Sequence, residues 1–433
     1  MIVGGGFTGL WAAHQLLDRG ASVALLDAGV CGEGPSGRNG GFVDHLGHAA
    51  PRLRAIGGDA GAGATVEESL DSVRAIGAWC DANGVDAWFR PAGQIVASTA
   101  VAHDGGEAET MEALTALGFG DELVALTPEE VRRRCASPLL RGGTLVRSTA
   151  TVHPARLGRG LRARLVERGA RVFEHARVTA LRDEPAGVVA ATAGGRVRAG
   201  AAILATGAWS ARLPPLRRRL TVTSSHIVLT EPVPDVLEEL GWTGGEAITD
   251  SRRLVHYFRT TDDGRILFGW GGGRIACGGR IGAREELDAG VVAQTATDLH
   301  AVFPRLAGRR IEHAWGGPID ASPAHLPIVD TLAGNGRTHV AFGYTGNGVG
   351  PSHLCGRILA SLALDERDAL TRLPIVGARD RLLPPEPLRV AGGAAIRRAL
   401  DSRERAEQAG RRVAPLARAV SAIPNLLGVQ IGR

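Results

Sequence analysis

A glycine turn near the start of the chain limits the fold more than any other feature of the sequence. The turn has the spacing Gly4-x-Gly6-x-x-Gly9 and follows a short apolar run. Apolar residues then recur at helical spacing over residues 10–17. A second apolar run over residues 22–27 has the composition of a buried parallel strand. The sequence therefore predicts a βαβ unit, the building block of a doubly wound α/β domain.

The same turn has the residues that dinucleotide binding requires. Gly4 permits a tight turn, Gly6 lets the backbone approach a pyrophosphate, and Gly9 allows the helix to pack closely on the strand. The helix N-terminus offers free N–H groups and a partial positive charge to the phosphates. Asp27 ends the second strand, where an acidic residue can accept hydrogen bonds from a ribose and disfavours a 2′-phosphate. A purely structural βαβ unit would not need three glycines and an acid in register.

Composition excludes several classes of protein. The chain has 433 residues, 44% of them hydrophobic, which suffices for two ordinary domains or one large bilobal fold. No stretch approaches the roughly 18–20 apolar residues of a membrane helix, so we predict no membrane partner. The five cysteines form no C-x-x-C pair, which predicts neither a metal site nor a disulfide framework and favours a cytoplasmic location. All 50 basic residues are arginine, so a Schiff-base lysine is excluded.

The charge pattern also bears on partners. The net charge is +5, the arginines are dispersed, and only 4% of residues are aromatic, so we predict no nucleic-acid partner. Residues 380–433 form a charged helical pattern that we expect on the surface, with contact to a membrane or nucleic acid as the less favoured interpretation.

A polar glycine segment, "GPSGRNGGFV" over residues 34–43, distinguishes FAD from NAD. A plain NAD domain would continue with another helix and parallel strand. We instead expect an irregular loop that passes under an extended cofactor and supplies N–H donors to it. A flexible surface loop is the alternative interpretation.

Three further local patterns predict secondary structure. Residues 63–83 have the apolar spacing of a long helix. A second helix is expected to begin at Thr127 with a capping box to Glu130. Asp263-Gly264 lies between two alternating apolar runs, which predicts a hairpin turn.

Taken together, "IVGGGFTGLWAAHQLL", "LLDA" and "GPSGRNGG" resemble the D-amino-acid-oxidase-like superfamily of FAD oxidoreductases. The polar segment is most similar to the γ-glutamylputrescine oxidoreductase-like branch, and a second glycine turn, "GYTGNGVGP", adds to the resemblance. The resemblance implies a two-domain α/β fold: a Rossmann-type FAD-binding domain interleaved with an antiparallel-sheet substrate domain. The implied segments are 1–87, 151–219 and 318–366 for the FAD domain, 88–150 and 220–317 for the substrate domain, and 367–433 for a C-terminal helical extension.

The resemblance also implies a non-covalently bound FAD that contacts two glycine turns. The first turn holds the pyrophosphate, and the second directs a helix N-terminus at the pyrimidine end of the isoalloxazine, where negative charge builds on reduction. A backbone group near Val178 is expected on the adenine side, and Trp209 is equally consistent with a core position. The expected FAD-binding residues are Gly4, Gly6, Phe7, Thr8, Gly9, Asp27, Ala28, Ser36, Gly37, Arg38, Asn39, Gly40, Gly41, Val178, Thr206, Gly207, Trp209, Gly343, Tyr344, Thr345, Gly346, Asn347, Gly348 and Val349.

The activity that the resemblance implies is oxidation of a C–N bond in an amine or amino acid. Hydride transfer to flavin N5 gives an imine that water then hydrolyses. The candidate catalytic residues are Tyr344, His45, His256, Arg259 and Asn347. We favour Tyr344 because it lies in the second glycine turn. Either histidine is also consistent with a structural, hydrogen-bonded role, and Arg259 with a substrate carboxylate or a surface ion pair.

Several questions stay open at the level of sequence. Some relatives use a lysine to promote reaction with oxygen; this chain has none, so oxygen and another carrier are both retained as electron acceptors. The alternatives in function are a tailoring flavoenzyme of a natural-product or aminophosphonate pathway and a non-catalytic flavin-binding protein. The oligomeric state is not predicted. Only Met1–Val3 precede the first glycine, against about 5–6 residues in a typical strand, so we expect the true start upstream.

Overall fold

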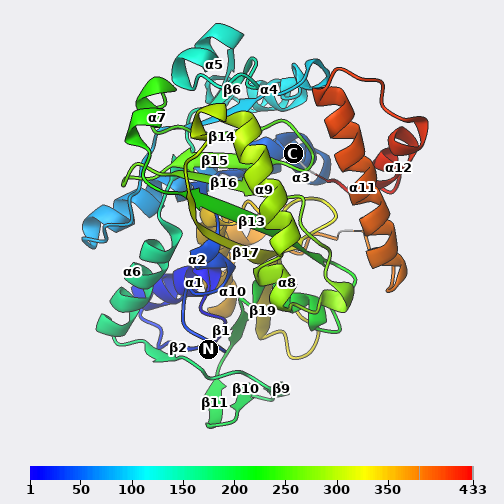
Figure 1. The fold of residues 1–433 in the computed structure, drawn as a ribbon. Coiled ribbons are helices and arrows are strands. Elements are labelled where there is room, and N and C mark those ends of the chain that lie inside the picture. Colours follow the sequence, from blue (N-terminus) through cyan, green and yellow to red (C-terminus); the bar gives the residue numbers. More distant parts are fainter. Residues whose placement is uncertain (380, 432–433) are drawn as a thin grey trace. The chain divides into compact units, whose positions relative to one another are not determined.

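The computed structural model describes residues 1–379 and 381–431, which form two compact units (Figure 1). The first unit contains residues 1–89, 152–220 and 319–379. The second contains residues 90–151, 221–318 and 381–431. Residues 381–431 group with the second unit, whereas the sequence suggested a separate extension.

The first unit is built on a six-stranded sheet of Rossmann type, as predicted. Strand β1 lies between β12 and β2 and is parallel to both, and β8 and β19 extend the parallel part of the sheet. Strand β18 joins one edge in the antiparallel direction. In sheet order the strands are β18 (Ile328–Thr331), β19 (Thr338–Phe342), β12 (Ala202–Leu204), β1 (Ile2–Val3), β2 (Ala24–Leu26) and β8 (Arg171–Phe173).

Helix α1 is the central helix of this unit. It begins directly after the glycine turn, and its Trp11 is buried in edge-on contact with Trp79 at 5.3 Å and with His353 at 4.9 Å. Trp79 lies on α3 and His353 on α10, so both helices pack against α1. The helices of this unit are α1 (Phe7–Asp18), α2 (Pro35–Arg38), α3 (Ala50–Ala82), α6 (Pro154–Glu167) and α10 (Val349–Ala363), with the 3₁₀ helices η1 (Leu46–Ala49), η4 (Gly207–Arg212) and η7 (Leu370–Arg372).

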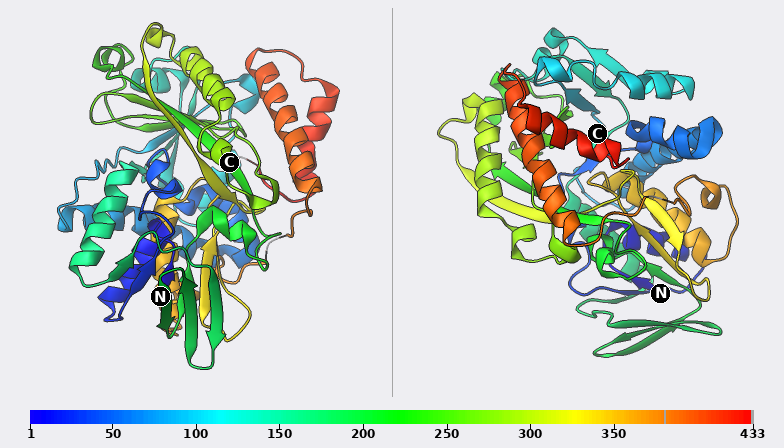
Figure 2. Two further views of the ribbon diagram at one scale, coloured as in Figure 1. Left: turned by 60° about the horizontal axis from the view of Figure 1, so that its bottom comes forward. Right: turned by 90° about the vertical axis from the view of Figure 1, so that its right-hand side faces the viewer.

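Two elements of this unit differ from the sequence-based expectation. We expected a helix over 63–83, but α3 begins at Ala50 and contains Gly58 at φ 64° and ψ −177°, where two helical segments meet. Glycine adopts this conformation without the steric cost that other residues pay. In addition, β9 (Ala180–Glu184), β10 (Gly187–Thr192) and β11 (Gly195–Ala199) form a small antiparallel sheet (Figure 2).

The second unit is built on an eight-stranded, mainly antiparallel sheet. Its Asp263-Gly264 turn joins β15 to β16 in an antiparallel hairpin, as predicted, with Gly264 at φ 75°. The β14–β4 pair is parallel. In sheet order the strands are β17 (Ile311–Ala321), β13 (Thr221–Thr230), β16 (Ile266–Trp270), β15 (His256–Thr260), β14 (Ala247–Asp250), β4 (Gln94–Ala97), β6 (Gly143–Val146) and β5 (Leu123–Leu126).

Aromatic side chains on one face of this sheet form part of the hydrophobic core of the unit. Phe258 of β15 stacks on Phe268 of β16 and meets Phe303 edge-on at 5.4 Å, just beyond the end of α9 (Ala289–Val302). Figure 1 shows α9 running across strands β13, β15 and β16. Other helices of the unit are α4 (Ala108–Ala116), α5 (Pro128–Arg134), α7 (Pro234–Glu239) and α8 (Ala283–Glu286), and α5 has the predicted capping box between Thr127 and Glu130.

Helices α11 (Leu388–Gln408) and α12 (Pro415–Leu426) form a hairpin that belongs to the second unit. Leu400 packs in a buried cluster with Leu254 and Trp270. The Glu404 carboxylate accepts hydrogen bonds from the backbone N–H groups of Arg253, at 2.8 Å, and Leu254, at 3.2 Å. Burial, together with the nearby negative charge of Asp250, raises the pKa of Glu404 to about 7.

This pKa makes the stability of the second unit depend on pH. The pKa of Glu404 lies above its ordinary value of 4.5, so the folded state binds this proton more tightly than the unfolded state does. The stabilisation is present below about pH 4.5 and is lost as the pH rises through about 7, a difference of roughly 3 kcal/mol. Since Gln also offers an oxygen to both amides but does not titrate, we expect Glu404→Gln to be more stable than the wild type at about pH 8.5.

Urea unfolding at about pH 5 and about pH 8.5 measures the effect. The advantage of the variant should shrink toward the lower pH. Glu112→Gln, at an exposed position of α4, is the matched control and should show no pH-dependent difference. An equal difference at both pH values would show that Glu404 does not titrate between them.

Candidate functional site

The first glycine turn connects β1 to α1 and leaves the N-terminus of α1 open. Gly6 occupies the N-cap position with an extended backbone, and it has no side chain with which to cap the helix. The N–H of Phe7 donates to Ser36 Oγ at 2.9 Å. The rest of the first helical turn can direct its N–H groups at an anionic ligand, as dinucleotide-binding turns do.

Close backbone packing explains the glycines of this turn. A Cβ atom on Gly9 would lie 2.0 Å from the carbonyl oxygen of Gly4. A Cβ on Gly4 would lie 2.4 Å from the carbonyl oxygen of Ala205, and Gly4 has φ 107°, which other residues rarely adopt. The turn therefore has no room for side chains, so a pyrophosphate can approach its backbone closely.

Asp27 lies at the end of β2 and braces this turn. Its Oδ2 accepts a hydrogen bond from Gly5 N at 2.6 Å, and its Oδ1 accepts one from Gly29 N at 2.7 Å. A carboxylate has about four acceptor sites, so two lone pairs stay available for ribose hydroxyls. The predicted ribose contact is compatible with this geometry, and the bracing of the turn is a second role that the sequence did not reveal.

The polar glycine segment is not the irregular loop that we expected. Residues Pro35–Arg38 form the short helix α2, which Pro35 begins at a position that favours its fixed φ. Asn39 Nδ2 donates to the carbonyl oxygens of Pro35, at 3.1 Å, and Ser36, at 2.8 Å, and Asn39 Oδ1 accepts from Gly41 N at 2.7 Å. The Ser36 and Asn39 side chains therefore shape the segment around the first turn. Arg38 donates to the carbonyl oxygen of Glu33.

The second glycine turn leads into α10 and is held by Asp320. Asp320 Oδ2 accepts from Gly343 N at 2.6 Å, and the Asp320 carbonyl oxygen accepts from Thr345 N at 2.9 Å. Thr345 and Gly346 both have positive φ, and Gly348 occupies the N-cap of α10. Burial raises the pKa of Asp320 to about 6. Sequence reasoning missed Asp320, although an acid within an otherwise apolar block was a visible signal.

The hydroxyls of Thr8 and Tyr344 are hydrogen-bonded at 2.7 Å and so join the two glycine turns. Thr8 is in the first turn of α1, and Tyr344 lies just before α10. Burial raises the pKa of Tyr344 well above its ordinary value, so the hydroxyl stays protonated. We predicted Tyr344 as a catalytic residue; the structure places its hydroxyl on the seam between the two turns.

His45 and Asn347 lie in the same region of the first unit, where they meet a histidine that the sequence analysis did not select. His45 caps η1, because its Nδ1 accepts from Gly47 N at 3.0 Å. The ring of His48 lies with Nδ1 3.0 Å from the carbonyl oxygen of His45 and Nε2 3.5 Å from Asn347 Nδ2. Spacing alone could not show that His48 reaches the second glycine turn, because the two segments meet only in the fold.

His256 is deeply buried in the second unit, with 1% of its side chain exposed. Its Nδ1 lies 2.8 Å from Asp250 Oδ2, and its Nε2 lies 3.1 Å from Asp298 Oδ2 on α9. Burial opposes protonation of the ring, but the two carboxylates outweigh it and raise the pKa of His256. The structural role that we kept as an alternative fits this environment.

Arg259 lies on the opposite face of β15 from His256. Side chains alternate along a strand, so Tyr257 and Arg259 share one face, while His256 and Phe258 share the face toward α9. Tyr257 Oη is hydrogen-bonded to Ser225 Oγ at 2.7 Å. Arg259 is only 4% exposed, so it is not the surface residue of our second alternative, and burial lowers its pKa to about 10. His256 and Arg259 therefore do not belong to one cluster.

The remaining predicted contacts lie in the first unit. Val178 is partly buried against the cluster that contains Leu26 and Ala202. Thr206 Oγ1 is 2.8 Å from Ser210 Oγ, and Gly207 begins η4 with φ 48°. Trp209 is 40% exposed, so its alternative assignment to the core is wrong.

The chain's residues fit FAD at both glycine turns. The first turn has no side chains that would block a pyrophosphate, and the Asp27 carboxylate has acceptor sites left for ribose hydroxyls. Both α1 and α10 have a glycine at the N-cap position, so their N-termini can offer N–H groups to the pyrophosphate and to the ring. Within residues 1–379 and 381–431, no group of three or more His, Cys, Asp or Glu side chains is arranged to hold a metal ion.

The close contact at Gly9 predicts the effect of adding a methyl group. Overpacking costs about 1–3 kcal/mol, so Gly9→Ala should lower the free energy of unfolding and raise the FAD dissociation constant about tenfold or more. Flavin fluorescence and denaturant unfolding measure both. Gly63→Ala on α3 is the control, because its Cβ would meet nothing within 4 Å. Unchanged FAD affinity in Gly9→Ala would contradict the account of the turn.

A double-mutant cycle tests the link between the turns. We expect Thr8→Val, Tyr344→Phe and the double variant to show a coupling of about 1 kcal/mol in the free energy of unfolding. Thr8→Ser keeps a hydroxyl and should retain wild-type stability. If Tyr344 instead acts directly in catalysis, Tyr344→Phe will lower kcat strongly while Thr8→Val will not.

Comparison with known proteins identifies the family. The family model of the FAD dependent oxidoreductases (DAO) matches residues 1–362. The chain is 29% identical over 388 residues to the probable oxidoreductase OrdL of Rhizobium meliloti (strain 1021), covering 86% of this chain and 85% of that protein. It is 29% identical over 394 residues to the γ-glutamylputrescine oxidoreductase of Escherichia coli (strain K12), covering 86% of each.

Solved structures show the same fold. Glycine oxidase from Geobacillus kaustophilus has a TM-score of 0.72 at 22% identity, covering 88% of this chain and 98% of that one. L-proline dehydrogenase from P. horikoshii has a TM-score of 0.66 at 18% identity, covering 86% and 94%. With the family model spanning both glycine turns, the chain belongs to the DAO family and is an FAD-dependent oxidoreductase.

Proposed function

We propose that the protein oxidises the C–N bond of an amino acid, and that Arg259 binds the substrate carboxylate. Arg259 carries the proposal because it is a buried cation beside Tyr257, on the sheet face that α9 does not cover. A guanidinium forms bidentate hydrogen bonds with a carboxylate, and burial strengthens that attraction. The proteins that this chain resembles include a γ-glutamylputrescine oxidoreductase and a glycine oxidase, whose names refer to an amine and an amino acid.

The neighbouring side chains support this use of the sheet face. Gln94 Nε2 donates to Thr249 Oγ1 at 2.9 Å, and both lie on the Tyr257 face by strand register. Tyr257 has its pKa raised to about 12 by burial, so it stays a neutral hydroxyl. We infer that this polar sheet face binds the substrate. Arg259 would supply the positive charge for the carboxylate, and Gln94, Thr249 and Tyr257 would supply neutral hydrogen-bonding groups around the amine.

We propose that FAD binds to the first unit. Residues of the first glycine turn, with Asp27, would hold the pyrophosphate and ribose, and the N-terminus of α10 would offer partial positive charge to the ring. When bound, FAD supplies the hydride acceptor for the carbon that bears the amine. We propose non-covalent binding, which predicts that denaturation releases the flavin from the protein fraction.

The chain's part in the reaction is to bind, orient and desolvate the substrate. Hydride loss requires a neutral amine, and burial favours the neutral form by lowering an amine's pKa. Arg259 would fix the carboxylate end so that the carbon bearing the amine points in one direction. His45, His48 and Asn347 remain candidates for polar contacts near the second glycine turn. A cytoplasmic location is also kept as a proposal.

Anaerobic mixing with a panel of amines and amino acids tests the substrate class. Bleaching of the flavin absorbance by amino acids, and weaker bleaching by amines without a carboxylate, would support the proposal. Reoxidation in air then separates oxygen from another electron acceptor. If no compound in the panel bleaches bound FAD, a non-catalytic flavin-binding protein replaces the enzyme in the proposal.

Substitution of Arg259 tests the carboxylate contact. We expect Arg259→Gln to raise KM for the amino acid about a hundredfold, because loss of a charge-assisted hydrogen bond costs about 1.5–3 kcal/mol. Arg259→Lys should recover part of the loss, since it keeps the charge without the bidentate geometry. Oxidation of an amine lacking the carboxylate should change little. Arg305→Gln is the control, at a position 70% exposed. Equal losses for both substrates would indicate a structural role.

A further inference from the structure

Helix α12 presents an apolar face to solvent, which is the reverse of an ordinary surface helix. Leu416 is 76% exposed and Leu426 is 81% exposed, with Ile423 also exposed between them. These residues recur at positions i, i+7 and i+10, on one side of the helix. The buried residues of α12 lie on the other side; they are Ala417, Ser421 and Pro424. The outward face is therefore larger and more hydrophobic than the inward one.

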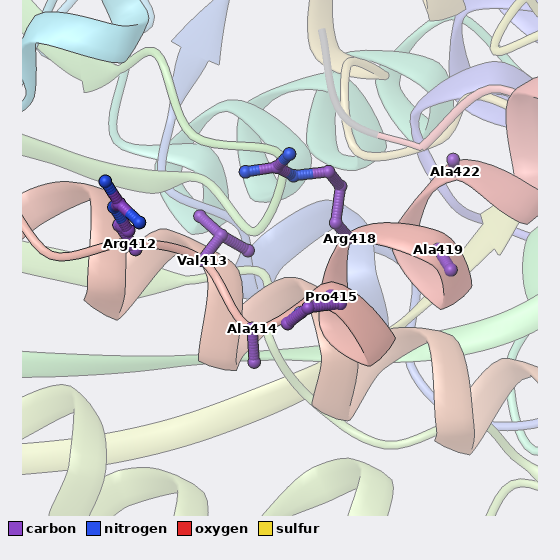
Figure 3. Close-up of a pocket in the computed structure, with 7 residues that line it drawn as sticks. All are labelled: Arg412, Val413, Ala414, Pro415, Arg418, Ala419 and Ala422. Atoms are coloured by element: carbon purple, nitrogen blue, oxygen red, sulfur yellow. The ribbon is translucent and has the colours of Figure 1, made fainter.

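The segment that contains this face carries only positive charge. Arg411 and Arg412 precede α12, Arg418 lies in its second turn, and the sequence after Gln408 contains no Asp or Glu. Figure 3 shows Arg412, Val413 and Arg418 around the entry to the helix, where they line a shallow pocket with Ala419. Exposed arginines in a segment that contains no acidic residue complement an anionic surface.

We propose that α12 is a membrane-surface anchor that lies flat on an anionic leaflet. Leu416, Ile423 and Leu426 would enter the boundary between headgroups and acyl chains, where amphipathic helices bury their apolar side chains. The arginines would contact lipid phosphates at the rim. Within the described residues no helix is long and apolar enough to cross a bilayer, so the contact would be peripheral. We predicted no membrane partner from the sequence and kept membrane contact of residues 380–433 as the less favoured interpretation, which the exposed leucines now favour.

A second copy of the chain is a less suitable occupant. A symmetric dimer through this face would bring the arginines of two copies close together, which costs free energy. An acidic protein would complement the positive charge alone. An anionic membrane surface complements the charge and also accepts the exposed apolar side chains between its headgroups and acyl chains. The attachment of the hairpin to its own unit does not use this stripe: Glu404, Gln408 and Asn425 contact residues 252–254 from other sides.

Sedimentation of the FAD-loaded full-length protein with lipid vesicles tests the proposal. We expect binding to vesicles of phosphatidylcholine with phosphatidylglycerol, little binding to phosphatidylcholine alone, and loss of binding at high salt. Leu416→Glu and Leu426→Glu should each weaken binding about tenfold or more, the factor that corresponds to burial of one leucine side chain. Replacing Arg412 and Arg418 by Gln should weaken it on anionic vesicles.

Leu287→Glu is the matched control, because Leu287 is 55% exposed and lies on a different element. It should leave vesicle binding unchanged, and all variants should keep wild-type FAD content. Equal vesicle binding by the wild type and Leu416→Glu would overturn the proposal. A second result would also overturn it: the wild type binds neither kind of vesicle and sediments as a dimer, and Leu416→Glu dissociates that dimer. That result would assign the face to contact with a second copy of the chain.

Discussion

A hydrogen bond between the hydroxyls of Thr8 and Tyr344 holds the two glycine turns of the first unit together. The two residues are 336 positions apart, so this hydrogen bond connects two glycine turns that are distant in the sequence. The helices behind the turns approach closely, since a Cβ on Gly356 of α10 would lie 2.8 Å from Cβ of Trp11. The N-termini of α1 and α10, each with a glycine at the N-cap position, are thereby held at fixed positions relative to one another. This arrangement suits a cofactor that needs partial positive charge at both its pyrophosphate and its ring.

Charged side chains lie on both faces of the large sheet in the second unit. On the α9 face, Asp250, His256 and Asp298 form a buried network in which each charge has a partner. On the other face, Tyr257 is hydrogen-bonded to Ser225, and Arg259 donates to the carbonyl oxygen of Thr260. Burial lowers the pKa of Arg259, and the nearby carboxylates of Asp262 and Asp263 oppose that shift. A guanidinium has five N–H donors in a fork that matches a carboxylate, which supports the proposed role of Arg259 in substrate binding. The strand alternation of β15 thus distinguishes the two residues that sequence had grouped as candidates.

Local patterns predicted the parts of this protein that short-range physics determines. The glycine spacing of the first turn, the capping box at Thr127 and the hairpin at Asp263 each depend on a few neighbouring residues, and each lies where expected. The fold class followed from them together with the resemblance. Long-range contacts were not predictable in the same way. The bracing by Asp320, the position of His48 beside Asn347 and the burial of Arg259 all depend on segments that meet only after folding. Helix α2 was missed because glycine-rich composition favours a loop, while Pro35 starts a helical turn.

A crystal structure of the FAD-bound protein tests the central claim most directly. The account predicts that the pyrophosphate lies within hydrogen-bond distance of the backbone N–H groups at the start of α1. It also predicts that the pyrimidine edge of the ring faces the N-terminus of α10, with the Thr8–Tyr344 hydrogen bond intact. An FAD whose pyrophosphate contacts neither turn, or whose ring lies away from α10, would contradict the account.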